Sequence, residues 1–101
     1  MGSYWDNWVN KNKHLRCAGE AKRRAAKLNA TPKNLSQEDW NKIDEFYKES
    51  TRLSVETGIP HEVDHIIPLQ PRKGDPKGEH APWNLRVVTA SENRSKGNKA
   101  V

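Results

Sequence analysis

The spacing of apolar side chains predicts two helices in the first half of the chain. Residues 16–30 are mostly good helix formers with a thin apolar face, and Thr31-Pro32 should end that helix. A second, amphipathic helix is predicted over residues 37–56, capped by Ser36 and carrying acids in its first turn. Its aromatic and branched residues recur at helical spacing and are the expected core: Trp40, Ile43, Phe46, Tyr47 and Leu53.

The second half of the chain changes to short, β-prone runs. Residues 61–69 and 85–89 are predicted to form a two-stranded hairpin, joined by a long connection rich in proline and glycine. Trp83, just before the returning strand, is expected in the core. Thr89 and Glu92 have the spacing of a capping box, so a short helix should begin at Ala90 and end near Gly97. The fold class expected is α+β.

Composition indicates a small core and a polar periphery. Leu, Ile, Val and Phe make up only 17 of the 101 residues. Cys17 is the only cysteine, which excludes an internal disulfide and a multi-cysteine zinc site, so a metal would need Asp, Asn or His ligands. The first residues lack the pattern of a signal peptide, and no apolar run approaches the length of a membrane span. We therefore expect a cytoplasmic protein with no membrane partner.

Charge is distributed unevenly along the chain. The sequence has 18 Lys and Arg against 13 Asp and Glu, a net charge of +5. Residues 11–33 hold eight basic side chains against the single acid Glu20, a local charge of +7, whereas residues 37–62 are acidic and the C-terminal run is basic again. Two basic regions around an acidic one suit a polyanion such as nucleic acid, but basic runs also occur as solvated helix faces. Charge alone leaves both interpretations open.

Three fragments of the second half carry a recognisable pattern. They hold an Asp-His pair, an Asn-Leu and an Asn-x-x-Lys, in that order within about forty residues: His61–Leu69, His80–Leu85 and Glu92–Asn98. Over about residues 61–99 the chain resembles the HNH endonucleases, especially the small forms common in bacteriophages. The resemblance implies a ββα-metal core that hydrolyses nucleic-acid phosphodiesters. It divides the chain into a basic helical extension over residues 1–35 and a nuclease domain over residues 36–101, within one compact unit.

The resemblance also implies roles for four residues. His65 is the expected general base, and an unperturbed histidine is largely neutral at pH 7. Asp64 and Asn93 are the expected ligands of one metal ion, and their oxygen atoms suit Mg²⁺ or Mn²⁺. Asn93 stands where the family name places a final histidine, which argues against zinc. Asn84 is expected to brace the hairpin and so orient the base.

The assignment of Asp64 and His65 to one site raises a geometric difficulty. Neighbouring side chains of a regular strand point to opposite faces of the sheet. The strand should therefore end or bulge at this pair, and Pro68 is compatible with an early end of regular pairing.

Three further residues have weaker assignments. Lys96 shares a helix face with Asn93 and is expected either to reach a phosphate beside the metal or only to complement the helix dipole. His61 shares the strand parity of His65 and is expected to be a partly exposed strand residue, with an accessory contact to phosphate or metal water as the alternative. His80 recurs in the resemblance, and a hydrogen bond within a turn is its expected role.

DNA is the expected substrate, and either a second copy of the chain or phage packaging or replication proteins are the other expected partners. The basic helix should supply affinity for phosphates without taking part in the chemistry. The residues expected to contact DNA are Lys22, Arg23, Lys27, Arg94 and Lys96. The alternative function is a non-catalytic DNA-binding accessory module that keeps the HNH fold.

Overall fold

The computed structural model describes the backbone of residues 4–97 and the side chains of residues 15–97. The elements, in chain order, are α1 (Tyr4–Lys27), α2 (Gln37–Thr57), β1 (His61–His65), the 3-10 turn η1 (Pro82–Asn84), β2 (Leu85–Thr89) and α3 (Ala90–Lys96). Helices and an antiparallel hairpin confirm the predicted α+β class. Within the described residues, every helix is too short or too polar to cross a membrane.

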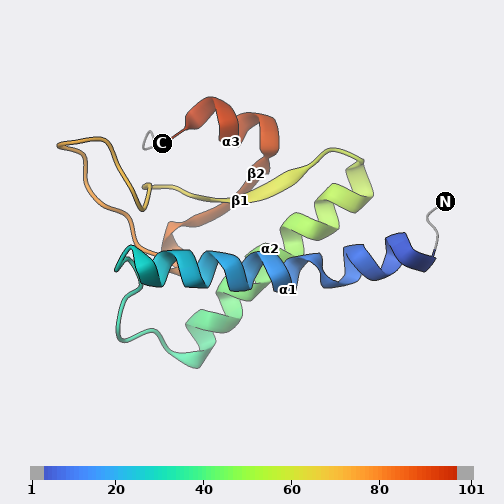
Figure 1. Ribbon diagram of the computed structural model, residues 1–101, viewed down its shortest axis with the longest axis horizontal. Helices are drawn as coiled ribbons and strands as arrows, with labels where there is room; N and C mark the ends of the chain where they lie inside the picture. Colours follow the sequence, from blue (N-terminus) through green and yellow to red (C-terminus); the bar gives the residue numbers. More distant parts are fainter. Residues whose placement is uncertain (1–3, 98–101) are drawn as a thin grey trace.

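The hairpin lies between α3 on one face and the two long helices on the other (Figure 1). Asp64 of β1 is directly opposite Arg86 of β2, and His65 is opposite Leu85. Because side chains alternate along a strand, Val63 points into the core formed with α2, while Asp64 points to the α3 side and bonds to a residue of that helix. The hairpin thus presents the Asp64 carboxylate to α3.

The main core lies between α1, α2 and the hairpin. Ile43 and Tyr47 of α2 and Leu85 of β2 are buried there, as expected for the two helix residues. The partly buried side chains around them come from every neighbouring segment: Cys17, Ala18, Ala21, Leu35, Trp40, Phe46 and Val63. A second, smaller cluster joins the end of α1 to the connection between the strands, through Ala25, Ala30 and Leu69. The helix of the predicted extension therefore packs into the same core as the hairpin.

The helix ends confirm the caps predicted from sequence. Ser36 accepts a hydrogen bond from the Asp39 N–H at 3.1 Å while Asp39 caps the Ser36 N–H in return. Thr89 and Glu92 form the same reciprocal pair at the start of α3. Gly58, at φ 72°, ends α2 in the left-handed conformation that glycine adopts at low cost.

The predicted bounds of α1 are wrong at both ends. The helix begins at Tyr4, well before residue 16, and it ends at Lys27 before the proline is reached. Asn29 adopts a left-handed φ of 54°, and the Ala30 N–H donates to the Ala25 carbonyl at 2.9 Å. These are the features of a Schellman ending, so a local backbone turn ends the helix and the Thr31-Pro32 pair only follows it.

The first strand stops short of residue 69, at the Asp64-His65 pair where an early end or a bulge was expected, and Trp83 is not in the core. β1 ends at His65, because the Ile67 backbone bonds to the side chain of Asn84 instead of to a partner strand. Trp83 is 59% exposed. Residues 82–84 form a 3-10 turn rather than a strand, and this turn directs Asn84 inward and Trp83 outward.

The connection between the strands folds back on itself at Gly78. The Gly78 N–H donates to the Pro68 carbonyl at 2.8 Å. A Cβ atom at Gly78 would lie 1.8 Å from the Ile67 carbonyl oxygen and 2.8 Å from Asn84 Nδ2. Only a residue without a side chain allows the two passes of the connection to approach this closely.

Gly78→Ala should therefore lower the free energy of unfolding by about 3 kcal/mol, because the added methyl group overlaps backbone atoms that cannot move independently. Chemical denaturation followed by circular dichroism measures the change. Gly19→Ala is the matched control, since a Cβ there meets only the end of the Arg23 side chain at 3.7 Å. That control should raise the stability by about 0.5 to 1 kcal/mol, because Gly19 lies within a helix. Equal stability of the two variants would contradict the packing described for Gly78.

Candidate active site

A cavity of about 480 Å³ opens at the end of β1 and gathers residues from three elements and the connection. Its lining includes the predicted base and both predicted metal ligands, His65, Asp64 and Asn93, together with Lys96 of α3. Arg24 of α1 also lines the cavity. Residues more than 60 positions apart in sequence are thus brought to one place, and the predicted catalytic residues form a candidate active site.

The early end of β1 resolves the geometric difficulty posed by Asp64 and His65. Asp64 points toward α3, whereas His65 is the last residue of the strand and belongs to the opposite parity. The chain turns away immediately after His65, with the Ile66 N–H bonded to the Asn84 carbonyl at 2.9 Å. Both side chains can therefore line a cavity at the strand end without a bulge.

Asp64 is a buried carboxylate held between two cations. Its side chain is 7% exposed, and its two oxygens accept from Arg86 Nε and from Lys96 Nζ, each at 3.0 Å. Lys96 also donates to the His65 carbonyl at 2.7 Å. The Lys96 ammonium group therefore lies between Asp64 and the main chain of the predicted base, a position that neither expectation for Lys96 described.

The oxygen donors near Asp64 suit a hard cation. The Asn93 amide donates through Nδ2 to Glu62 Oε2 at 3.1 Å, and Oδ1 is the atom of this side chain with lone pairs to offer a metal ion. Within the described residues, no three His, Cys, Asp or Glu side chains group as a metal site. An ion held by Asp64 and Asn93 would therefore keep several water or phosphate ligands, as Mg²⁺ prefers. The donor chemistry fits Mg²⁺ or Mn²⁺, provided that the ion displaces a cation now bonded to Asp64.

His65 is neutral at pH 7 in this environment. Burial, and after it the adjacent His80 ring, lower the pKa of His65 from 6.5 to about 4, while the Asp64 carboxylate opposes the shift. His65 Nε2 lies 2.9 Å from His80 Nδ1. The hydrogen bond of the His80 side chain is therefore to His65, and the predicted bond within a turn is wrong, because the connection folds the His80 ring back toward the strand end.

Asn84 holds the connection with its whole side-chain amide. Oδ1 accepts from the Ile67 N–H at 2.9 Å, and Nδ2 donates to the carbonyls of Ile67 and Glu79 at 3.0 and 2.9 Å. The side chain is buried, so these backbone groups have no water to replace it. Asn84 thereby fixes the chain on both sides of the turn that follows His65.

His61 lies on the same strand parity as His65 but makes a local contact. Its Nδ1 is 2.7 Å from the Ile59 carbonyl oxygen, and the residue is partly exposed. The main chain of His61 is tied to α2: Ser50 Oγ donates to the His61 carbonyl at 2.9 Å, and Ser54 Oγ accepts from the His61 N–H at 2.8 Å. These bonds position the start of β1, and the side chain lies at its far end from the cavity.

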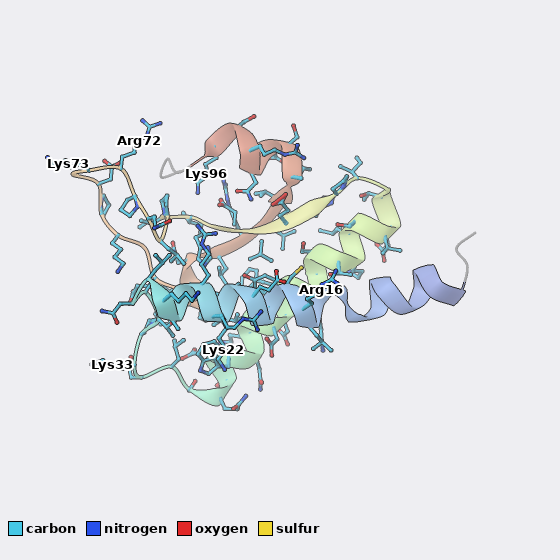
Figure 2. The ribbon with its side chains drawn as sticks, in the orientation of Figure 1. Arg16, Lys22, Lys33, Arg72, Lys73 and Lys96 are labelled. Carbon is cyan, nitrogen blue, oxygen red and sulfur yellow. The ribbon has the colours of Figure 1, made fainter. Side chains whose placement is uncertain are left out.

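The basic residues of α1 point to different surfaces. Lys22 Nζ lies 4.6 Å from the centre of the Trp40 ring, on the α2 side of the helix (Figure 2). Arg23 and Lys27 are exposed, as is Arg94 of α3. Lys22 packs on Trp40 while Lys96 bonds to Asp64, so these two predicted phosphate contacts lie apart.

Two sets of basic residues escaped the sequence analysis. Arg24 is two positions from Lys22, a rotation of about 200° around a helix, so it enters the cavity when Lys22 faces α2. The spacing of Arg24 from Lys22 could have identified Arg24 from the sequence, but only if the face of α1 that packs on α2 had been known. Arg72 and Lys73 are exposed at the tip of the connection (Figure 2), where the sequence indicated only a loop.

Three comparisons with known proteins leave the function to be inferred from these residues. Scans against protein-family models, curated proteins and solved structures found no match. The residues of the cavity and the resemblance of their motifs therefore carry the functional inference.

Asn84→Ala should lower the free energy of unfolding by about 3 kcal/mol, because it removes three buried hydrogen bonds and leaves backbone groups unpaired. Trp83→Ala, at the exposed neighbouring position, should change it by less than about 1 kcal/mol. Urea denaturation of both variants measures the difference. A mild effect at Asn84, no larger than that at Trp83, would show that the amide does not brace the connection.

Proposed function

We propose that this chain is a metal-dependent, HNH-type endonuclease that hydrolyses DNA phosphodiester bonds. The observation that carries the proposal is the convergence of Asp64, His65 and Asn93 on one cavity, where two basic side chains, Arg24 and Lys96, also lie. A phosphodiesterase needs a base for the attacking water, positive charge near the phosphate and help for the departing oxygen. The cavity holds a residue type for each of these tasks.

His65 serves as the general base in this proposal. Its neutral ring accepts a proton from water as the water oxygen attacks phosphorus and the bond between phosphorus and the 3′ oxygen breaks. The departing 3′ oxygen takes a proton from solvent, which leaves 5′-phosphate and 3′-hydroxyl ends, as the resemblance implies. Arg24 supplies positive charge to the phosphate from the α1 side of the cavity.

Asp64 and Asn93 would hold one Mg²⁺ or Mn²⁺ ion, which when bound neutralises charge on the phosphate and stabilises the departing oxygen. In this proposal Lys96 releases its oxygen of Asp64 when an ion binds, since both carboxylate oxygens accept from cations. The released ammonium group is then available to a phosphate oxygen. This exchange of one cation for another keeps the buried carboxylate paired throughout.

DNA is the proposed partner, and the cytoplasm the proposed compartment. One cavity acts on one strand, so a single copy would nick, and a double-strand break would require a second copy or a second encounter. The exposed basic residues of the two helices, Arg23 and Lys27 of α1 and Arg94 of α3, would contact phosphates away from the cleaved bond.

A non-catalytic DNA-binding module is the second candidate function. The observation that favours it is the complete pairing of Asp64 by Arg86 and Lys96, which satisfies the carboxylate without a metal. Relaxation of supercoiled plasmid in Mg²⁺, with and without EDTA, separates the two functions. Cleavage that EDTA abolishes supports the nuclease, whereas DNA binding with no cleavage in Mg²⁺ or Mn²⁺ supports the module.

His65→Ala should lower the plasmid cleavage rate by about 10² to 10⁴, because the variant lacks the proton acceptor but keeps both metal ligands. Asp64→Ala should lose cleavage and also divalent-ion binding, measured by Mn²⁺ paramagnetic relaxation of solvent water. His65→Ala is the control for that second measurement and should bind Mn²⁺ as the wild type does. Cleavage by His65→Ala within threefold of wild type would remove His65 from the role of base.

Arg24→Gln should lower the cleavage rate at saturating DNA by about tenfold or more, because Arg24 lines the cavity and supplies charge to the reacting phosphate. Lys22→Gln is the matched control on the same helix, and its ammonium group contacts Trp40 instead. Single-turnover cleavage with excess protein measures both variants. The control should retain the wild-type rate, and an equal effect of the two substitutions would contradict a local role for Arg24.

A further inference from the structure

His80 is a polar ring in a fully buried position. It is 0% exposed, and among the described residues His80 and Ile43 have the largest fully buried side chains. Its backbone N–H donates to the Ala30 carbonyl, at the end of α1, at 2.9 Å. Its ring centre lies 6.1 Å from that of Trp40. The end of α1 and the aromatic side chain of α2 therefore hold His80 in place.

The ring of His80 has one polar partner, although it has two nitrogens. Nδ1 lies 2.9 Å from His65 Nε2, while His80 Nε2 is buried with no hydrogen-bond partner in the part of the chain that the structure describes. Leaving a buried nitrogen unpaired costs stability, and an apolar ring at this position would avoid that cost. Packing alone therefore does not account for a histidine here, and the contact with His65 is the feature that distinguishes it from phenylalanine.

We propose that His80 is a positioning residue for the base: its Nδ1 accepts the Nε2–H of His65 and so fixes the His65 tautomer that has its lone pair on Nδ1. The inference rests on the proposed function, in which His65 accepts a proton from water. With Nε2 of His65 engaged by His80, Nδ1 is the nitrogen left for that task.

Two neutral rings allow this hydrogen bond in either direction, and the proposed role of His65 and the charges around it select one. Two neutral imidazole rings in contact share one proton between the facing nitrogens. If His80 donated, His65 would carry its own proton on Nδ1 and would have no lone pair for water. If His65 donates, the lone pair lies on Nδ1, and Arg24 and Lys96, which line the same cavity as His65, favour a lone pair over an N–H near them.

The same contact assists the proton transfer itself. When His65 Nδ1 takes the proton, the ring becomes a cation and its Nε2–H becomes a stronger donor. The bond to His80 Nδ1 then strengthens at the moment when the charge develops, with no movement of either buried ring. His80 thus acts through His65 and does not itself contact the substrate.

Long-range ¹H–¹⁵N spectra of the full chain at neutral pH report the tautomer directly. The His65 signals are assigned from their loss in His65→Ala. We expect His65 to show a protonated Nε2 and an unprotonated Nδ1 in the wild type. In His80→Phe, which keeps a buried ring, both tautomers of His65 should be populated, and kcat for plasmid cleavage should fall by about 10- to 100-fold with KM unchanged. His80→Asn, whose Oδ1 can replace Nδ1 as acceptor, should restore both the tautomer and most of kcat.

A His65 proton on Nδ1 in the wild type would overturn the proposal, as would a wild-type tautomer and rate in His80→Phe. A loss in His80→Phe that His80→Asn does not restore would also overturn it, because a purely structural role predicts that pattern. If His80→Phe does not fold, the proposal is still tested by the His65 tautomer in the wild type and by the tautomer and kcat of His80→Asn. If His65 shows the predicted tautomer but the protein cuts no DNA, the contact with His80 stands and the nuclease function is refuted. Failure of the contact and failure of the proposed function are therefore distinguishable.

Discussion

The turn of the chain after His65 depends on the side chain of Asn84. A strand that ends in the interior leaves peptide groups that neither a partner strand nor water can satisfy, and a single buried amide bonds to both polar groups of Ile67. The same amide bonds to the Glu79 carbonyl, so the two ends of the connection are tied together. The cavity beyond the strand end, the close pass at Gly78 and the position of His80 all follow from this arrangement.

The buried carboxylate of Asp64 sets the electrostatics of the cavity. A charge that is 7% exposed requires compensation, and Arg86 and Lys96 supply it from the neighbouring strand and from α3. Lys96 also bonds to the backbone of His65, so its ammonium group attaches α3 to the strand end. In the proposed function a divalent ion replaces one of these two cations, so the buried carboxylate is never left unpaired.

The first helix is more than a basic extension. Its apolar face packs into the main core beside Ile43 and Tyr47, and its end bonds to the connection, where Lys77 Nζ donates to the Leu28 carbonyl at 2.6 Å. Through these contacts the helix brings Arg24 to the cavity and holds the backbone of His80. The basic segment and the hairpin thus contribute to one site, and the charge of α1 is shared between the cavity, the surface and the packing contact of Lys22 with Trp40.

The sequence by itself determined the features that depend on neighbouring residues. The capping boxes at Ser36 and Thr89 and the α+β order of elements follow from hydrogen bonds and side-chain periods that span only a few positions. The order of the Asp-His, Asn-Leu and Asn-x-x-Lys motifs along the chain also identified candidate residues of the cavity. An early end of β1 was also expected, because Asp64 and His65 had to serve one site, whereas tertiary structure alone decided how the connection is held beyond that end and brought His65 to His80. Both features depend on bonds between residues far apart in sequence, because Asn84 satisfies the Ile67 backbone and the Ala30 carbonyl accepts from the His80 N–H.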